Sequence, residues 1–162
     1  MVSVILNFFL SIFPGESRAR RCYYTPQPVP PVRDLETLLA SMDPTLEEGE
    51  FAFVSFPAGS QPHPPPESVI CTFREREGMT WILRREEADR RGFPSVFPCR
   101  MITLNVVSDL EAIGFLARIT TELAARKISV NPVSAYHHDY LFVPTRQAEE
   151  ALQVLRQLCD KR

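Results

Sequence analysis

The sequence predicts a fold of the α/β class, more narrowly α+β, in which antiparallel β-sheets carry helices packed on one face. Short β-rich runs alternate with stretches of helical periodicity from residue 33 onward. Hydrophobic residues make up 44% of the chain and charged residues 23%, values typical of folded globular proteins. The 162 residues are enough for one ordinary domain or for two small domains that share a core.

Residues 1–32 are expected to form an apolar and Pro-rich extension and linker outside the folded body. The apolar run between residues 4 and 13 is shorter than the ~20 residues that span a bilayer. Arginines follow this run instead of preceding it, which does not fit a secretory signal peptide. We therefore expect no membrane association and a cytoplasmic location, with organelle targeting by the extension as the alternative.

The first half of the body is expected to contain a short helix, three strands that form a meander, and a second short helix. Asp34 is a good N-cap for the first helix, and Asp43-Pro44 ends it. The Arg74–Gly78 segment has the polarity and the glycine of a hairpin turn. The expected elements cover residues 35–42, 51–56, 68–73, 79–83 and 85–91.

The second half is expected to have the order β-α-β-β-α, which is a ferredoxin-like arrangement. Pro132 removes a ladder donor and so predicts an edge strand or a bulge at its position. Ser108 and Asp109 offer caps at the start of the first helix. The expected strands are residues 101–107, 128–135 and 140–143, with helices near 113–127 and from Thr145 onward.

Several sequence blocks, taken in order, resemble the small stand-alone tandem ACT-domain proteins. The resemblance covers residues 33–158, and agreement over many blocks is more specific than any single motif. It implies two ferredoxin-like ACT modules, residues 33–99 and 100–162. The blocks that carry it are Glu47-Glu-Gly-Glu-Phe51, Thr72-Phe-Arg-Glu-Arg-Glu-Gly78, Thr80-Trp-Ile-Leu83, Glu86-Glu-Ala-Asp89, Ser108-Asp-Leu-Glu-Ala-Ile-Gly114 and Tyr136-His-His-Asp-Tyr-Leu-Phe-Val-Pro144.

The resemblance implies a non-enzymatic regulatory protein that binds a small molecule such as an amino acid and acts by allosteric regulation. It also implies a homodimer. In ACT domains the ligand usually lies between the loop after the first strand and the second strand of a neighbouring module, here residues 107–114 and 128–135. The ligand-binding residues implied in this way are Ser108, Asp109, Leu110, Glu111, Ile113, Gly114, Asn131 and Val133.

The residue types in this loop suit an amino acid. Gly114 has no Cβ, so backbone and ligand can approach closely. The N–H groups at a helix N-terminus attract a carboxylate. Asp109 and Glu111 are candidates for an α-ammonium, although acidic residues in a first helical turn are also favoured by the helix dipole. In the first module the corresponding loop is hard to place, so that module is expected to be structural.

The alternative function is a structural or protein-interaction module without a ligand. The net charge of −2 gives nucleic acid no general attraction, and Phe51 and Phe53 are assigned to the core, so no nucleic-acid partner is expected. The chain shows no signature of a catalytic nucleophile or a phosphate loop, so no catalytic residue is assigned.

No metal site and no cofactor are predicted. His137-His138-Asp139 is the one histidine cluster, but adjacent side chains on a strand point apart. A hairpin turn accounts for the same residues, with a ligand or interface role as the alternative. The four cysteines lie far apart in sequence and are expected to be reduced structural thiols.

Overall fold

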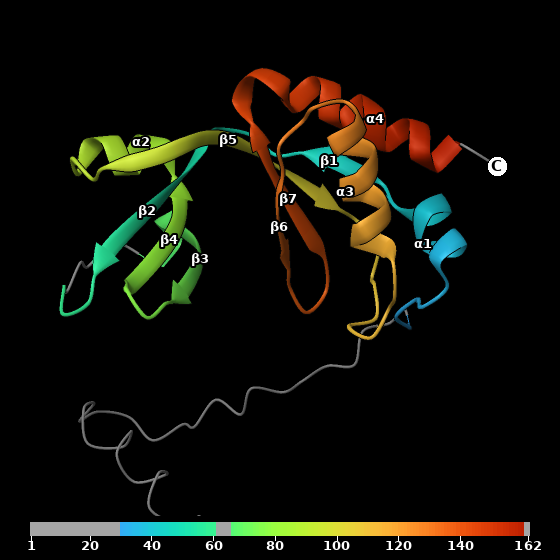
Figure 1. Cartoon of the computed structure of the whole chain (residues 1–162), viewed down its shortest axis with the longest axis horizontal. Helices are drawn as coiled ribbons and strands as arrows, with labels where there is room; N and C mark the ends of the chain where they lie inside the picture. The colour runs from blue at the N-terminus through green and yellow to red at the C-terminus, as the bar shows by residue number, and fades with distance from the viewer. Residues whose placement is uncertain (1–29, 61–65, 161–162) are drawn as a thin grey trace, which may run out of the picture.

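One long strand, β5 (Ser95–Leu104), joins the two halves of the protein. The computed structural model describes residues 30–60 and 66–160, and Figure 1 shows their strands as one curled sheet beneath the helices. In chain order the other elements are α1 (Leu35–Ser41), β1 (Pro44–Leu46), β2 (Phe51–Pro57), η1 (Pro66–Ser68), β3 (Val69–Arg74), β4 (Gly78–Arg84), α2 (Arg85–Arg90), α3 (Phe115–Ala125), β6 (Asn131–Ser134), β7 (Asp139–Pro144), η2 (Thr145–Gln147) and α4 (Ala148–Asp160).

The sheet is antiparallel and has the order β3-β4-β2-β5-β7-β6, with β1 also paired to β5. The first part of β5 pairs with β2, and its later part pairs with β1 and β7. Each half therefore has the same arrangement, in which a hairpin strand lies next to the first strand of its half: β4 beside β2, and β7 beside β5. In the first half the described residues between β2 and β3 form no α-helix and contain only the short 3₁₀ helix η1. In the second half β1, which precedes β2 in the chain, pairs with the later part of β5 on the edge opposite β7.

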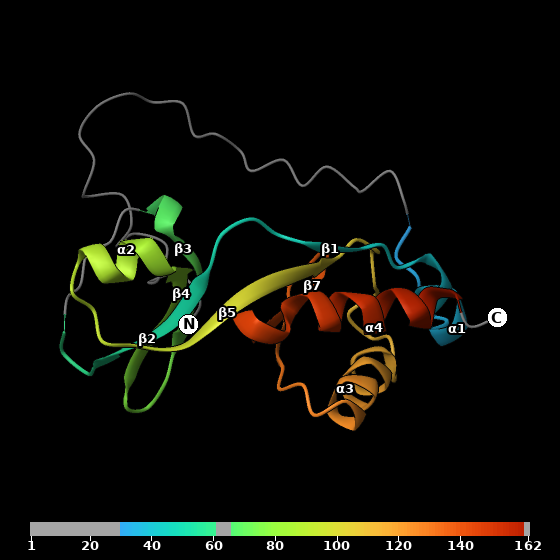
Figure 2. The ribbon, with the colours of Figure 1, turned by 90° about the horizontal axis from the view of Figure 1, so that it is seen from above.

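Helices cover one face of the sheet (Figure 2). In the second half, α1, α3 and α4 bury a large core against β5 and β7, with Leu38, Ile102, Ile119, Leu141 and Leu155 fully enclosed. In the first half the helix α2 contributes Ala88 to a smaller core around Trp81. Phe56 and Phe93 pack on Trp81, with ring centroids 4.5 and 6.4 Å away. These aromatic rings fill space on the face that carries α2.

The opposite face of the sheet holds an inter-module cluster, made of Phe51, Ile82, Cys99, Met101 and Phe142. These residues come from strands of both halves. The rings of Phe51 and Phe142 meet edge to face with centroids 6.0 Å apart, and Phe53 meets Phe142 in the same way at 5.8 Å. Burial of these apolar side chains fixes the two halves relative to each other.

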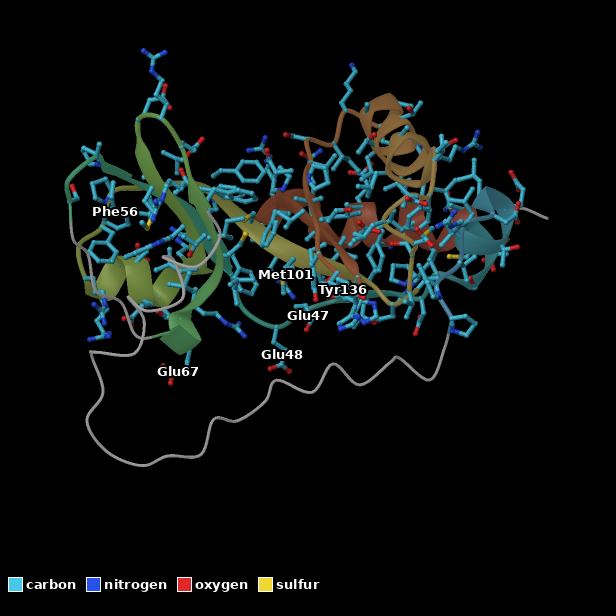
Figure 3. The ribbon with its side chains drawn as sticks, turned by 90° about the horizontal axis from the view of Figure 1, so that it is seen from below. Glu47, Glu48, Phe56, Glu67, Met101 and Tyr136 are labelled. Atoms are coloured by element: carbon cyan, nitrogen blue, oxygen red, sulfur yellow. The ribbon has the colours of Figure 1, made fainter. Side chains whose placement is uncertain are left out.

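The segment between β1 and β2 crosses from one half to the other and is anchored to β5. The Glu47 N–H donates to the Met101 carbonyl at 2.8 Å, and Arg100 donates to the Glu47 carbonyl at 2.7 Å. The Thr103 hydroxyl donates to the Glu47 carboxylate at 2.6 Å. Figure 3 shows Glu47 beside Met101, while Glu48 points away from the body.

A β-bulge lies where β5 passes from one half to the other. The pairing of β2 with β5 shifts register between Phe51 and Phe53, and Phe97 has a φ of 55°. A left-handed backbone is uncommon for a bulky residue, and bulges increase the local twist of a strand. The Phe97 ring packs against Phe53, with centroids 5.9 Å apart, which helps to hold this conformation.

The predicted fold class is confirmed, and so are the helix capped by Asp34, the hairpin at residues 74–78 and the edge position of the strand that contains Pro132. The predicted meander is wrong, because β4 lies between β2 and β3. The strand expected at 101–107 is the second part of β5, which starts at Ser95. The strand expected at 128–135 is shorter, and β1 was not predicted.

The region expected to be an extension lies largely outside the described residues. Val32 already pairs with Ser108 in a parallel bridge. The helix α1 and the strand β1, which follow it, pack in the core of the second half. The division into modules at residue 100 therefore stays a prediction.

None of the described helices has the length and apolar character needed to cross a membrane. Cys71, Cys99 and Cys159 are free thiols, and Cys22 lies outside the described residues. Burial raises the pKa of the Cys99 thiol to about 12, so this buried side chain stays protonated and unreactive.

Replacing Phe142 with Ala is expected to destabilise the protein by about 3–5 kcal/mol, since it empties the centre of the inter-module cluster. Phe142 is only 1% exposed and contacts two other phenyl rings. Denaturant unfolding followed by circular dichroism measures the change. Val96→Ala, at a side chain that is 67% exposed, is the control and should change stability by less than about 0.5 kcal/mol. Equal effects of the two substitutions would contradict the role of the cluster.

Candidate functional site

The loop between β5 and α3 is held against the start of the folded chain. The Val32 N–H donates to the Val107 carbonyl, and the Asp109 N–H donates to the Val32 carbonyl, each at 2.9 Å. The Ala112 N–H donates to the Asp109 carbonyl at 2.9 Å, which closes a turn. These backbone bonds give the loop a defined shape before α3 begins at Phe115.

Gly114 is the N-cap of α3 and has a φ of 92°, a conformation that favours glycine. A Cβ at this position would lie 3.5 Å from Leu35 Cδ2, an ordinary contact. The glycine is therefore explained by its backbone conformation, and the close approach expected from sequence is not needed to account for it. No side chain of residue 114 caps the helix, so the first turn of α3 keeps N–H groups that have no intrahelical partner.

A cavity of about 140 Å³ lies at this end of α3. It combines the first turn of the helix with the preceding loop and with the hairpin that joins β6 to β7. Its wall therefore has a helix N-terminus on one side and polar side chains on the other. The lining residues are Ser108, Asp109, Leu110, Ala112, Gly114, Phe115, Leu116, Ala117, Ser134 and Asp139.

Asp139 is the most deeply buried charged residue of this wall, at 3% exposure. Its carboxylate accepts a hydrogen bond from the Ser108 hydroxyl at 2.8 Å and another from the Ser134 hydroxyl. Ser134 and Asp139 are cross-strand partners in the β6–β7 hairpin. The hairpin thus places a carboxylate and one hydroxyl group at the cavity, and the loop after β5 adds the Ser108 hydroxyl.

Arg33 binds both acidic residues of the loop. Its Nε lies 2.8 Å from Asp109 Oδ2, and another guanidinium nitrogen lies 2.6 Å from Glu111 Oε2. The Glu111 N–H also donates to Asp109 Oδ1 at 2.8 Å. The hydrogen bond from Arg33 is the main cause that holds the pKa of Asp109 below its usual range. Both candidate partners for a ligand ammonium are thus already engaged by a cation of the chain.

The structure brings together half of the sequence-predicted site residues. Ser108, Asp109, Leu110 and Gly114 line the cavity. Glu111 and Ile113 belong to the same loop without lining it, and the Ile113 side chain is 87% exposed.

The other two predicted residues are on β6. Asn131 pairs with Phe142 and Val133 pairs with Tyr140. Val133 packs against the inter-module cluster and does not line the cavity. The role of the predicted residues in ligand binding stays a prediction.

Sequence reasoning did not assign Ser134 or Asp139 to this site, and it considered Asp139 only within the histidine cluster. Asp139 starts a strand directly after a tight hairpin turn and lies opposite Ser134. This position is the signal that could have identified it from the sequence. Such a pairing depends on the register of the hairpin, which the predicted strand boundaries of 128–135 and 140–143 did not fix.

The histidine pair beside Asp139 lies in the hairpin turn, as expected. The Nδ1 atom of His138 lies 3.4 Å from the Val106 carbonyl oxygen, so the turn also contacts the end of β5. In the residues that the structure describes, no group of three or more His, Cys, Asp or Glu side chains is placed to hold a metal ion.

The β6 strand is the edge of the sheet on this side, and Pro132 is compatible with that edge position. The Ala135 N–H donates to the His138 carbonyl across the hairpin. Since N–H groups alternate along an antiparallel strand, the Pro132 nitrogen lies on the outer side. It removes a donor that an additional strand would need and breaks no bond to β7.

Comparison with known proteins assigns both halves to one family. The family model described as ACT domain matches residues 30–100, and a second model with the same description matches residues 96–157. No curated protein matches the chain at a significant level.

Solved structures include proteins of similar fold. A protein of unknown function from Vibrio cholerae, described as a possible transport protein, is 36% identical over 77% of this chain and 95% of its own, with a TM-score of 0.66. A protein from Agrobacterium tumefaciens is 12% identical over 73% and 89%, with a TM-score of 0.61. The ligand-free regulatory subunit of aspartate kinase from Thermus thermophilus is 11% identical over 74% and 97%, with a TM-score of 0.52. The last two show likeness of fold.

Replacing Arg33 with Gln is expected to raise the pKa of Asp109 toward the ordinary value of about 3.9. The substitution removes the hydrogen bond and the charge that lower this pKa. In the native protein the ion pair stabilises the fold above that ordinary value, and the contribution is lost as the pH falls through the lowered pKa of the folded state. Titration of the carboxyl groups by NMR measures the shift.

Arg118→Gln is the matched control for this titration, since Arg118 pairs with Glu122 on α3 at 3.1 Å. If Asp109 titrates at the same pH in the wild type and in Arg33→Gln, then Arg33 does not lower the pKa of Asp109.

Proposed function

The chain belongs to the ACT-domain proteins, with two such domains in tandem, and from this we propose that it is a non-enzymatic regulatory protein that binds an amino acid. ACT domains are ligand-binding regulatory modules, which supports the general role. The observation that carries the specific proposal is the cavity at the N-terminus of α3, in the loop where ACT domains usually bind their ligands.

The chemistry of the cavity suits both charged groups of an amino acid. The exposed N–H groups of the first helical turn and the positive end of the helix dipole favour a carboxylate. Asp139 and two serine hydroxyls also line the cavity and favour a cationic donor. The regulatory subunits of aspartate kinase share the fold, which is consistent with a regulatory role for this chain. A cytoplasmic location stays a prediction.

We propose further that the functional form is a homodimer in which the loop before α3 contacts a second copy. Leu110 is 67% exposed and lines the cavity, and Ile113 is 87% exposed on the same loop. Ligand pockets usually occupy about 300–1,000 Å³, so a cavity of 140 Å³ has room for a small ligand only, and the exposed Leu110 side chain lies at its edge. A second copy that packs on Leu110 and Ile113 would bury these side chains and close the open side of the cavity.

The alternative function, a protein-interaction module without a ligand, is favoured by one observation. An apolar depression of about 350 Å³ lies on the first half, away from the cavity of α3. Two of its lining residues, Phe73 and Val96, are large hydrophobic side chains that are exposed. A measurement of ligand binding at the cavity of α3 distinguishes the interaction module from the amino-acid-binding regulator.

Thermal unfolding of the full chain with each of the twenty amino acids tests the proposed function. Binding to the native state at a hundredfold excess over Kd stabilises it by about 2.7 kcal/mol, which raises Tm by about 5–10 °C. Ala117→Phe places a ring in the cavity from the first turn of α3 and should abolish the shift. Ala124→Phe, at an exposed position near the other end of α3, is the matched control and should keep it. If no amino acid raises Tm, the interaction-module function becomes the better account.

Ile113→Glu is expected to convert the dimer to a monomer, because it places a charge in the proposed contact. Light scattering after size exclusion measures the mass at several protein concentrations. Val96→Glu puts the same charge on the exposed depression of the first half and should leave the dimer intact. A wild type that is monomeric at all concentrations, or a dimer that only Val96→Glu disrupts, would refute this interface.

A further inference from the structure

We propose that Asp139 recognises the ammonium group of a small α-amino acid of about the size of alanine, while the N-terminus of α3 receives its carboxylate. This inference rests on the proposed function and adds the residue that selects amino acids over related acids. Asp139 belongs to the β6–β7 hairpin and not to the loop in which the resemblance places the ligand-binding residues.

The burial of Asp139 favours binding of a cationic group at this carboxylate. A carboxylate that is 3% exposed is costly to bury unless a cation or several hydrogen bonds compensate it. Asp139 receives hydrogen bonds from two hydroxyls, although an ionised carboxylate has room for about four. In the described part of the chain, no Arg or Lys forms an ion pair with Asp139. A bound ammonium group would supply the missing positive charge.

The guanidinium group beside this loop is already paired with other carboxylates. Arg33 is the cation beside this loop, and it binds Asp109 and Glu111. Those two carboxylates therefore already have a cationic partner, whereas Asp139 has two hydroxyl donors and, among the described residues, no ion pair. A ligand ammonium gains more at Asp139 than at Asp109, because it meets a buried charge without having to displace a guanidinium.

The size and the polarity of the cavity suit a small amino acid. The volume of 140 Å³ corresponds to about four or five water molecules at their liquid volume of about 30 Å³ each. An amino acid with a methyl side chain is of this size. The apolar lining side chains Leu110, Phe115 and Leu116 suit the methyl group.

The test compares L-alanine with L-lactate, which differ only in the ammonium group that lactate replaces with a hydroxyl. Isothermal titration of the full chain should show alanine bound at least tenfold more tightly than lactate. Asp139→Asn keeps the size of the side chain and an acceptor for Ser108, but removes the charge. It should weaken alanine binding at least tenfold and bring the affinities for alanine and lactate close together.

Ser134→Ala is the matched control, because it removes one hydroxyl donor and keeps the carboxylate. This variant should still prefer alanine to lactate. Thermal unfolding of both variants without ligand shows that each is folded, so a loss of binding by Asp139→Asn can be assigned to its charge.

Three results would overturn the inference: a wild type that binds no alanine, a wild type that binds lactate as tightly as alanine, or an Asp139→Asn variant that keeps the affinity for alanine. None of these alone overturns the proposed function, which fails only if none of the twenty amino acids raises Tm. The two failures are therefore distinguishable.

Discussion

The two modules depend on a single shared strand. β5 pairs with β2 in its first part and with β1 and β7 in its second part, so neither half has a complete sheet without it. Side chains that alternate along β5 serve different cores: Ile102 and Leu104 face the helices of the second half, and Cys99 and Met101 face the inter-module cluster. The modules are thus parts of one folded body. The bulge at Phe97 bends the sheet where the two halves meet.

The same construction positions the candidate site. The loop that follows β5 is tied to Val32 by two backbone hydrogen bonds, and the chain then enters α1, whose Leu38 and Leu39 are buried in the second core. The start of the folded chain is therefore a structural support for the loop. Arg33 adds an ion pair to Asp109 that is partly exposed, and such pairs contribute little stability. Its larger effect is to occupy the acidic groups of the loop, which leaves Asp139 as the carboxylate without an ion pair among the described residues that line the cavity.

Local sequence patterns predicted most helices and strands of the fold. They did not predict how segments that are distant in the sequence pair with one another. The Asp34 cap and the Pro132 edge strand follow from the chemistry of single residues, and both are observed. The position of β4 between β2 and β3 is set by long-range packing of Trp81 and Ile82 on opposite faces, which no local signal encodes. The same limit applies to the site, because the contact of Ser108 with Asp139 joins residues 31 positions apart through β7.

The β6–β7 hairpin gives a physical link between the cavity and the arrangement of the modules. Ser134 and Asp139 are at the cavity end of the hairpin, and Val133, Tyr140 and Phe142, which belong to the same two strands, pack in or against the inter-module cluster. A ligand that pulls on Asp139 therefore acts on the strands that hold the first half in place. Such a ligand regulates only if it binds one arrangement of the modules more tightly than another. The β6–β7 hairpin contacts both the cavity and the inter-module cluster, so a change at either one can shift the position of the hairpin.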